Sequence, residues 1–192
     1  MKKFFVTFLI LFTTIFFSSN IGHTSDFALI TKNTEIAAAL SALESVGKGD
    51  VISILNGNNA TGQPIRVLFK DLSIYGGSDC EALTTKTQSG KIIIYINSEH
   101  KGAPTEAIAC LIAHESQHHT MTNTKAEETK AWLKEVSTWN AFVRRDRTVA
   151  LMKHPLVKRE NYIAKLNARD NGQGDGIRKI IATNPVYAGL KN

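Results

Sequence analysis

The stretch from Ala107 to Ala113 is apolar at every position, and it constrains the fold of this 192-residue chain more than any other segment. Pro104 and Glu106 suit the first turn of a helix, where proline is tolerated and an acidic side chain meets the positive end of the helix dipole. A helix that is apolar all round is buried on every side. We therefore expect a central helix here, and the polar residues that follow it directly must be paired or bound to a metal.

Those polar residues are His114-Glu115-Ser116-Gln117-His118. Histidines at positions i and i+4 of a helix point the same way, so both imidazoles can hold one metal ion. Glu115 can then reach a metal-bound water without being a ligand, as in zinc hydrolases. The alternative is that both histidines emerge at the end of the helix and meet solvent. The burial of the helix favours a Zn²⁺ site with His114 and His118 as ligands and Glu115 as the general base.

A zinc site needs at least three protein ligands, and the next helix offers the third. Thr124 and Glu127 form a Ser/Thr-x-x-Glu capping box, which marks the helix start and gives Glu127 a bond to the backbone there. Glu128 lies instead on the apolar face of that helix, and a short turn between the helices brings it near both histidines. Glu128 is the predicted third ligand; the alternative is that it only favours a helix N-terminus. Glu135, on the same face, would orient a ligand histidine or form a buried ion pair.

The other elements predict an α+β domain with a small antiparallel β-sheet. The strongest strand signal is Ile92–Ile96. The expected elements are a helix over 33–46, an apolar run of ambiguous type over 50–55, a strand over 65–69, a hairpin with strands over 82–87 and 91–97, and helices after Pro104 that include 156–169 and 177–183. The buried helix would carry the active site, the following helix would carry the glutamate, and the C-terminal third would be mostly helical.

The N-terminus resembles a secretory signal. Two lysines precede an apolar stretch over 4–17 and a polar exit over 18–20, which is shorter than the roughly 20 residues of a spanning helix. We expect a signal peptide over 1–25, a single domain over 26–192, and a secreted or periplasmic protein; an uncleaved membrane anchor is the alternative. Without Lys2 and Lys3 the formal charge falls from +6 to +4. This modest excess indicates no nucleic-acid partner, and no membrane contact is expected beyond the signal segment.

Two cysteines, Cys80 and Cys110, leave two possibilities. An even count outside the cytoplasm is compatible with a disulfide. Cys110, however, lies in the apolar helix and can equally be a buried free thiol. Neither cysteine has the local setting of a nucleophile.

The motif His114-Glu115-x-x-His118, followed by Glu128-Thr129-Lys130-Ala131, resembles the gluzincin branch of zinc metallopeptidases. In that branch a His-Glu-x-x-His helix is completed by a glutamate from a following helix, often as Glu-x-x-Ala. The order of an early helix, a β-ribbon and the active-site helix is also similar to the small single-domain members. Two features depart from the family pattern. Nine residues separate His118 from Glu128, fewer than in many members, and Trp132 stands where an aspartate or asparagine is usual.

The resemblance implies a zincin-like fold and a zinc metallopeptidase whose ligands are His114, His118 and Glu128. Glu115 would take a proton from the metal-bound water and pass it to the leaving amine. The strand over 92–96 would present an edge to an extended peptide. The substrate would be a protein, a peptide or a cell-wall crosslink. The alternatives are a catalytically inactive zincin-fold binding protein of the cell envelope and a structural metal or envelope-binding protein in which the motif is accidental. Conceivable transition-state donors are Tyr162, Tyr187, His154 and Arg159.

Overall fold

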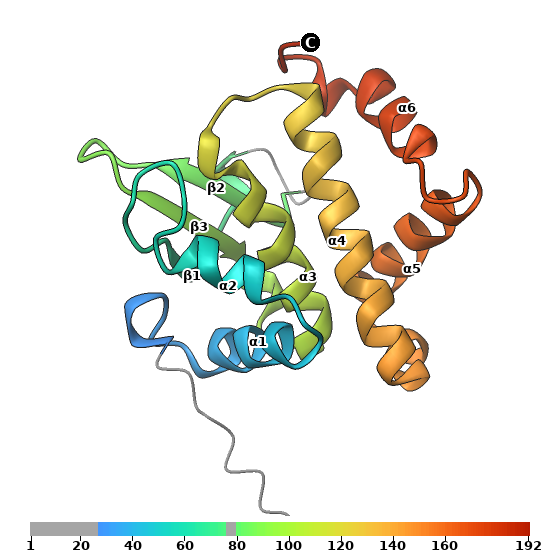
Figure 1. Cartoon of the computed structure of the whole chain (residues 1–192), viewed down its shortest axis with the longest axis horizontal. Helices are drawn as coiled ribbons and strands as arrows, with labels where there is room; N and C mark the ends of the chain where they lie inside the picture. The colour runs from blue at the N-terminus through green and yellow to red at the C-terminus, as the bar shows by residue number, and fades with distance from the viewer. Residues whose placement is uncertain (1–26, 76–79) are drawn as a thin grey trace, which may run out of the picture.

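The computed structural model describes residues 27–75 and 80–192 of the chain (Figure 1). The expected signal peptide, residues 1–25, lies outside the described residues. The helices are α1 (Thr34–Ser45), α2 (Gly49–Leu55), α3 (Thr105–Glu115), α4 (Lys125–Arg145), α5 (Pro155–Ala168) and α6 (Asp175–Thr183). The strands are β1 (Arg66–Lys70), β2 (Ala82–Lys86) and β3 (Ile92–Asn97). Two short 3-10 helices border the candidate site, η4 (Ser116–Thr120) and η6 (Pro185–Tyr187).

The three strands form one mixed sheet in the order β1-β3-β2. β2 and β3 pair antiparallel as the predicted hairpin, whereas β1 pairs parallel to β3. The predicted α+β class is confirmed, but the prediction of an antiparallel sheet is wrong. The hairpin determines how β2 pairs, but it does not determine which of its two strands a distant strand will join. That choice depends on burial, because Val67 of β1 and Ile94 of β3 lie side by side and are both fully buried.

The position of β3 overturns the expected substrate edge. β3 lies in the middle of the sheet and pairs on both sides, so the strand over 92–96 has no free edge. β2 is an edge strand, and it faces the candidate site. Any pairing between the sheet and an extended peptide next to the site must therefore use β2.

Helix α3 lies at the centre of the molecule, as its composition predicts. It packs against α1 and α4, with β3 and β2 along it, and every residue from Ala107 to Ala113 is buried (Figure 1). Local signals set its neighbours: the Asn33 side chain caps α1 by accepting from the Ile36 amide at 3.0 Å. The ambiguous run over 50–55 is the helix α2. The C-terminal third is helical, and α5 and α6 pack against α4 on the side away from the sheet (Figure 1).

Both cysteines are free thiols, so the structure contains the buried-thiol alternative and no Cys80–Cys110 disulfide. Cys110 is fully buried in α3, and Cys80 is half-buried just before β2. Burial raises the pKa of both thiols. Within residues 27–75 and 80–192, no helix combines the length and apolar character that crossing a membrane requires.

Candidate metal centre

The two histidines of the motif lie side by side at the end of the central helix. α3 ends at Glu115, and the chain continues as the 3-10 helix η4. The sequence predicted His118 in the α-helix, but it lies in η4. The imidazoles nevertheless lie together, with ring centres 5.3 Å apart. One ligand atom each of His114, Glu115 and His118 lies within 4.8 Å of the others. The i and i+4 spacing therefore brings these three side chains together as predicted.

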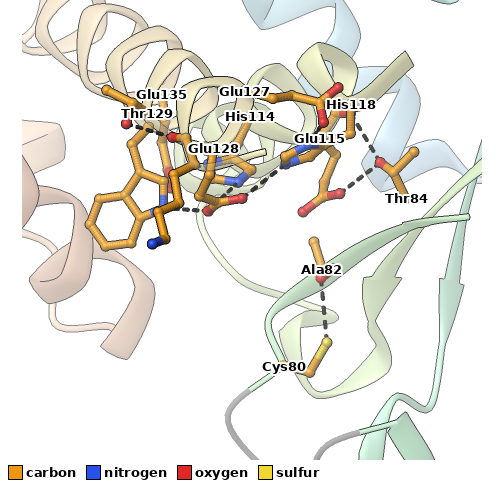
Figure 2. Close-up of polar contacts among 12 residues, drawn as sticks. Cys80, Ala82, Thr84, His114, Glu115, His118, Glu127, Glu128, Thr129 and Glu135 are labelled. Atoms are coloured by element: carbon orange, nitrogen blue, oxygen red, sulfur yellow. Dashed lines mark hydrogen bonds and ion pairs between the residues drawn. The ribbon is translucent and has the colours of Figure 1, made fainter. Parts of the chain in front are cut away.

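Glu128 completes the cluster from the first turn of α4. Its carboxylate lies between the imidazoles, with Oε1 3.5 Å from His114 Nε2 and Oε2 3.4 Å from His118 Nε2 (Figure 2). Zinc ligands in a tetrahedral site lie about 2.0–2.2 Å from the ion, so neighbouring ligand atoms are about 3.3–3.6 Å apart. Both contacts have this length, each through a different oxygen of the Glu128 carboxylate. Two imidazole nitrogens and a carboxylate oxygen are also donors that zinc prefers, so these residues fit a zinc ion.

The short connection between His118 and Glu128 works because the backbone turns sharply. Met121 and Asn123 both adopt left-handed conformations, with φ of 54° and 51°. Non-glycine residues rarely adopt this conformation, which costs free energy. The two residues end η4 and redirect the chain into α4, so nine intervening residues are enough. Both lie along the cleft described below.

Glu127 holds this turn in place. The Thr124 hydroxyl accepts from the Glu127 amide at 3.1 Å, which confirms the first half of the capping box. The Glu127 carboxylate accepts from the Asn123 amide at 2.8 Å, one residue before the predicted cap, and from the Thr120 hydroxyl. It also lies 3.8 Å from His118 Nδ1. Glu127 is therefore closer to the site than the helix geometry predicted, because the carboxylate extends back toward the preceding turn.

Glu135 lies behind His114, as the inward face of α4 predicts. Its Oε2 is 2.9 Å from His114 Nδ1, and its carboxylate also pairs with Arg159. Glu135 therefore contacts a motif histidine and also forms the buried ion pair that was the alternative prediction. Burial lowers the pKa of His114, but hydrogen bonds to Glu128 and Glu135 raise it more, to about 10. Burial raises the pKa of Glu128, but its bond with His114 outweighs this effect and leaves the pKa below its usual value.

Trp132 is a site residue to which sequence reasoning gave no role. Its Nε1 donates at 2.7 Å to Oε1 of Glu128, which lies four residues earlier on α4. The spacing was the available signal, since side chains at i and i+4 on a helix are neighbours. The residue that departs from the family pattern thus orients the predicted third ligand.

Glu115 faces the cleft and is held by the edge strand. Its Oε2 accepts from the Thr84 hydroxyl of β2 at 2.6 Å (Figure 2). The same hydroxyl lies 3.0 Å from the Glu115 carbonyl oxygen. No sequence signal identifies Thr84, because it lies 31 residues from Glu115 and meets it only through the packing of β2 against α3.

A cleft of about 440 Å³ opens over these side chains. Residues of β2, of the motif, of the start of α4 and of η6 line it. Of the four conceivable transition-state donors, Tyr187 and Arg159 line the cleft. Tyr162 is exposed on α5 outside it, and the His154 side chain caps α5 by accepting from the Leu156 amide. Burial raises the pKa of Tyr187, which keeps its hydroxyl a hydrogen-bond donor.

The geometry leaves two donor sets for one metal ion. His114 and His118 belong to both, and the third donor is Glu128 or Glu115. Each of the two carboxylates has one oxygen that accepts a hydrogen bond, Glu115 Oε2 from Thr84 and Glu128 Oε1 from Trp132. A comparison of the chain with protein-family descriptions, curated proteins and solved structures found no match.

Proposed function

We propose that this chain is a secreted or periplasmic zinc metallopeptidase with a zincin-like fold. The observation that carries the proposal is the position of the Glu128 carboxylate, 3.4 and 3.5 Å from the Nε2 atoms of the two motif histidines. Glu115 lies beside this cluster but is bonded to Thr84. These contacts support a division in which Glu128 would bind the metal and Glu115 would move the proton.

His114, His118 and Glu128 would hold the zinc ion. When bound, zinc supplies Lewis-acid chemistry that lowers the pKa of a coordinated water towards about 7. Glu135 bonds His114 Nδ1 at 2.9 Å, which would leave Nε2 free to bind the ion. Trp132 holds one carboxylate oxygen of Glu128. Because two of the three ligands have a fixed partner, they need little reorganisation to bind the metal.

Glu115 is the general base of the proposed reaction. Its carboxylate accepts the proton of the attacking water and later passes it to the leaving amine. Thr84 holds the carboxylate in the cleft through the 2.6 Å bond to Oε2. Tyr187 lines the same cleft, and we assign its hydroxyl as donor to the oxygen that becomes negative during attack, because Arg159 already donates to Glu135 and Glu160.

The substrate is a peptide, a protein or a cell-wall crosslink bound in extended form along β2. β2 pairs with β3 on one side only, and Ala82, Leu83 and Thr84 line the cleft. Backbone pairing to this edge would bring a peptide bond near Glu115, because Thr84 lies in this strand and its hydroxyl donates to the Glu115 carboxylate. A catalytically inactive binding protein is the alternative function, and the intact Glu115 argues against it.

Metal content tests the proposal. The purified protein, prepared without chelators, should contain one zinc ion per chain by mass spectrometry. His114→Ala and Glu128→Gln should lose it, whereas Glu115→Gln should keep it and lose hydrolysis of a broad peptide library. If Glu115 is the third ligand, the results of the two glutamine variants will be exchanged.

Two outcomes reject the proposal in different ways. Wild-type protein without zinc removes the metal site. Zinc that is present in wild type and Glu115→Gln alike, with no hydrolysis by either, identifies a zinc-containing binding protein in place of a peptidase.

A further inference from the structure

We infer that Arg159 is a positioning residue that holds two ligands of the metal centre, His114 and Glu128, through two separate side chains. Arg159 lies on α5, an element that supplies no ligand itself. The inference rests on the proposed function, because it concerns the same zinc site. It extends that function by making the geometry of the ligands depend on the packing of the C-terminal helices.

The first connection runs through Glu135. Arg159 Nη1 donates to Glu135 Oε1, and Nη2 donates to Oε2 at 3.3 Å. Oε2 is also the atom that lies 2.9 Å from His114 Nδ1. A guanidinium that contacts both carboxylate oxygens restricts the orientation of the carboxylate, which in turn restricts the imidazole ring. Glu135 is fully buried, so water cannot take over either role.

The second connection runs through Trp132. The guanidinium carbon of Arg159 lies 5.7 Å from the centre of the Trp132 ring, within the range of a cation–π contact. Tyr187 contacts the same ring edge-on, with centres 6.4 Å apart. The indole is thus held by two neighbours, and its Nε1 points to Glu128 Oε1 at 2.7 Å.

The charge balance also assigns Arg159 to this role. Glu135 and Glu160 are both fully buried, and Nη1 of Arg159 donates to a carboxylate oxygen of each. A buried carboxylate without a partner is strongly disfavoured, so the guanidinium is committed to Glu135 as its countercharge and donates to Glu160 beside it. Only about a quarter of the Arg159 side chain is exposed, although it borders the cleft. Arg159 therefore acts on the ligands and does not bind the substrate.

Substitutions of Arg159 and Trp132 test both connections. Arg159→Met removes the charge, Arg159→Lys keeps it without the bidentate geometry, and Trp132→Phe keeps the ring but loses the bond to Glu128. We expect Arg159→Met to weaken zinc binding by about 10- to 100-fold, with Arg159→Lys in between. The double variant Arg159→Met/Trp132→Phe should weaken binding less than the product of the single effects, because the substitutions share one connection. Zinc affinity is measured by competition with a chromogenic chelator.

A second readout separates positioning from general stability. The visible spectrum of the Co²⁺-substituted protein reports ligand geometry, and it should shift in the Arg159 variants that retain native circular dichroism. Arg178→Met is the matched control, because Arg178 forms an exposed ion pair with Asp175 on α6, and it should change neither readout. Should Arg159→Met not fold, Arg159→Lys and Trp132→Phe answer the same question with the same two measurements.

The outcomes distinguish this inference from the proposed function. Wild-type protein that binds no zinc rejects the proposed function, and the inference with it. Wild-type protein that binds zinc, with folded Arg159 variants of unchanged affinity and unchanged Co²⁺ spectrum, rejects the inference alone.

Discussion

The hydroxyl of Thr84 lies 2.6 Å from Glu115 Oε2 and joins the edge strand β2 to the candidate general base. We expect Thr84→Val to lower kcat about tenfold, because a hydrogen bond to a charged group contributes about 1.5 kcal/mol or more. Zinc content should stay at the wild-type level, since Thr84 contacts no proposed ligand. Thr84→Ser keeps the hydroxyl and should restore most of the rate. A Thr84→Val enzyme with wild-type kcat would show that the bond does not position Glu115.

Zinc binding should release a proton from His114. In the metal-free protein the hydrogen bonds of His114 raise its pKa to about 10, so the ring is protonated at neutral pH. Zinc can bind only the deprotonated ring, so the apparent affinity should rise by up to about tenfold per pH unit between roughly 6.5 and 10. Calorimetry at pH 7.5 in buffers with different ionisation enthalpies measures the released proton. Zinc affinity that is independent of pH over this range would contradict the prediction.

The same shift sets how the stability of the metal-free protein depends on pH. A histidine whose folded pKa lies above its unfolded value of 6.5 stabilises the fold fully below pH 6.5. This contribution is lost as the pH rises through about 10. Urea unfolding of the metal-free protein should therefore show a decreasing contribution of His114 over this range, measured as the difference between wild type and His114→Gln. A difference that grows with pH would contradict the sign.

Glu127 should matter for zinc affinity although it is not a proposed ligand. Its carboxylate holds the turn that contains two left-handed residues, and it lies 3.8 Å from His118 Nδ1. Glu127→Ala frees this turn, so we expect zinc affinity to fall about tenfold, as for other partners of metal ligands. Glu106→Gln, in the first turn of α3, is the control and should bind zinc like wild type. An unchanged affinity in Glu127→Ala would assign the residue to helix capping alone.

Both thiols of the unfolded protein should react with a thiol reagent without prior reduction. Cys80 and Cys110 are free, and burial raises the pKa of each, so a thiol reagent should react slowly with the native protein near neutral pH. After unfolding in guanidinium, two thiols per chain should react. Protein recovered from an oxidising compartment that shows no reactive thiol after unfolding would instead contain the disulfide.

Glu160 should be replaceable by glutamine without loss of stability. Burial, together with the nearby Glu135, raises the pKa of Glu160 well above its usual value, so the folded protein keeps a proton that the unfolded chain releases above about pH 4.5. Glu160 therefore destabilises the fold increasingly as the pH rises from that value. Glu160→Gln keeps the acceptor for Arg159 and removes this cost, so its Tm at pH 8 should equal or exceed that of wild type. Glu135→Gln, which disturbs the pairs with Arg159 and His114, should lower Tm under the same conditions.

Local patterns predicted most of the site because its parts come from short segments. The apolar run over 107–113 predicted a buried helix, and the spacing of His114 and His118 brought their rings together. The inward face of the next helix pointed to Glu128 and not Glu127 as the residue between the histidines, and it predicted Glu135 behind one of them. Each of these inferences needs only helix periodicity and one short turn, which neighbouring residues determine.

The errors and omissions concern contacts between distant segments. β1 joins β3 in parallel, so the predicted antiparallel sheet and the free edge of the strand over 92–96 were both wrong. The bond from Thr84 to Glu115 and the contact of Arg159 with Trp132 join residues far apart in sequence. No local pattern contains this information.

The sequence by itself thus indicated which side chains gather at the candidate metal centre, because His114, His118 and Glu128 come from one buried helix end, the turn after it and the start of the next helix. Only the tertiary structure decided how these side chains are held. It made β2 the strand beside the cleft and brought Thr84 to Glu115. It also placed Arg159 of α5 behind two proposed ligands. The physical reason is that strand order and helix docking depend on burying apolar surface from the whole chain at once, whereas helix periodicity acts within a few residues.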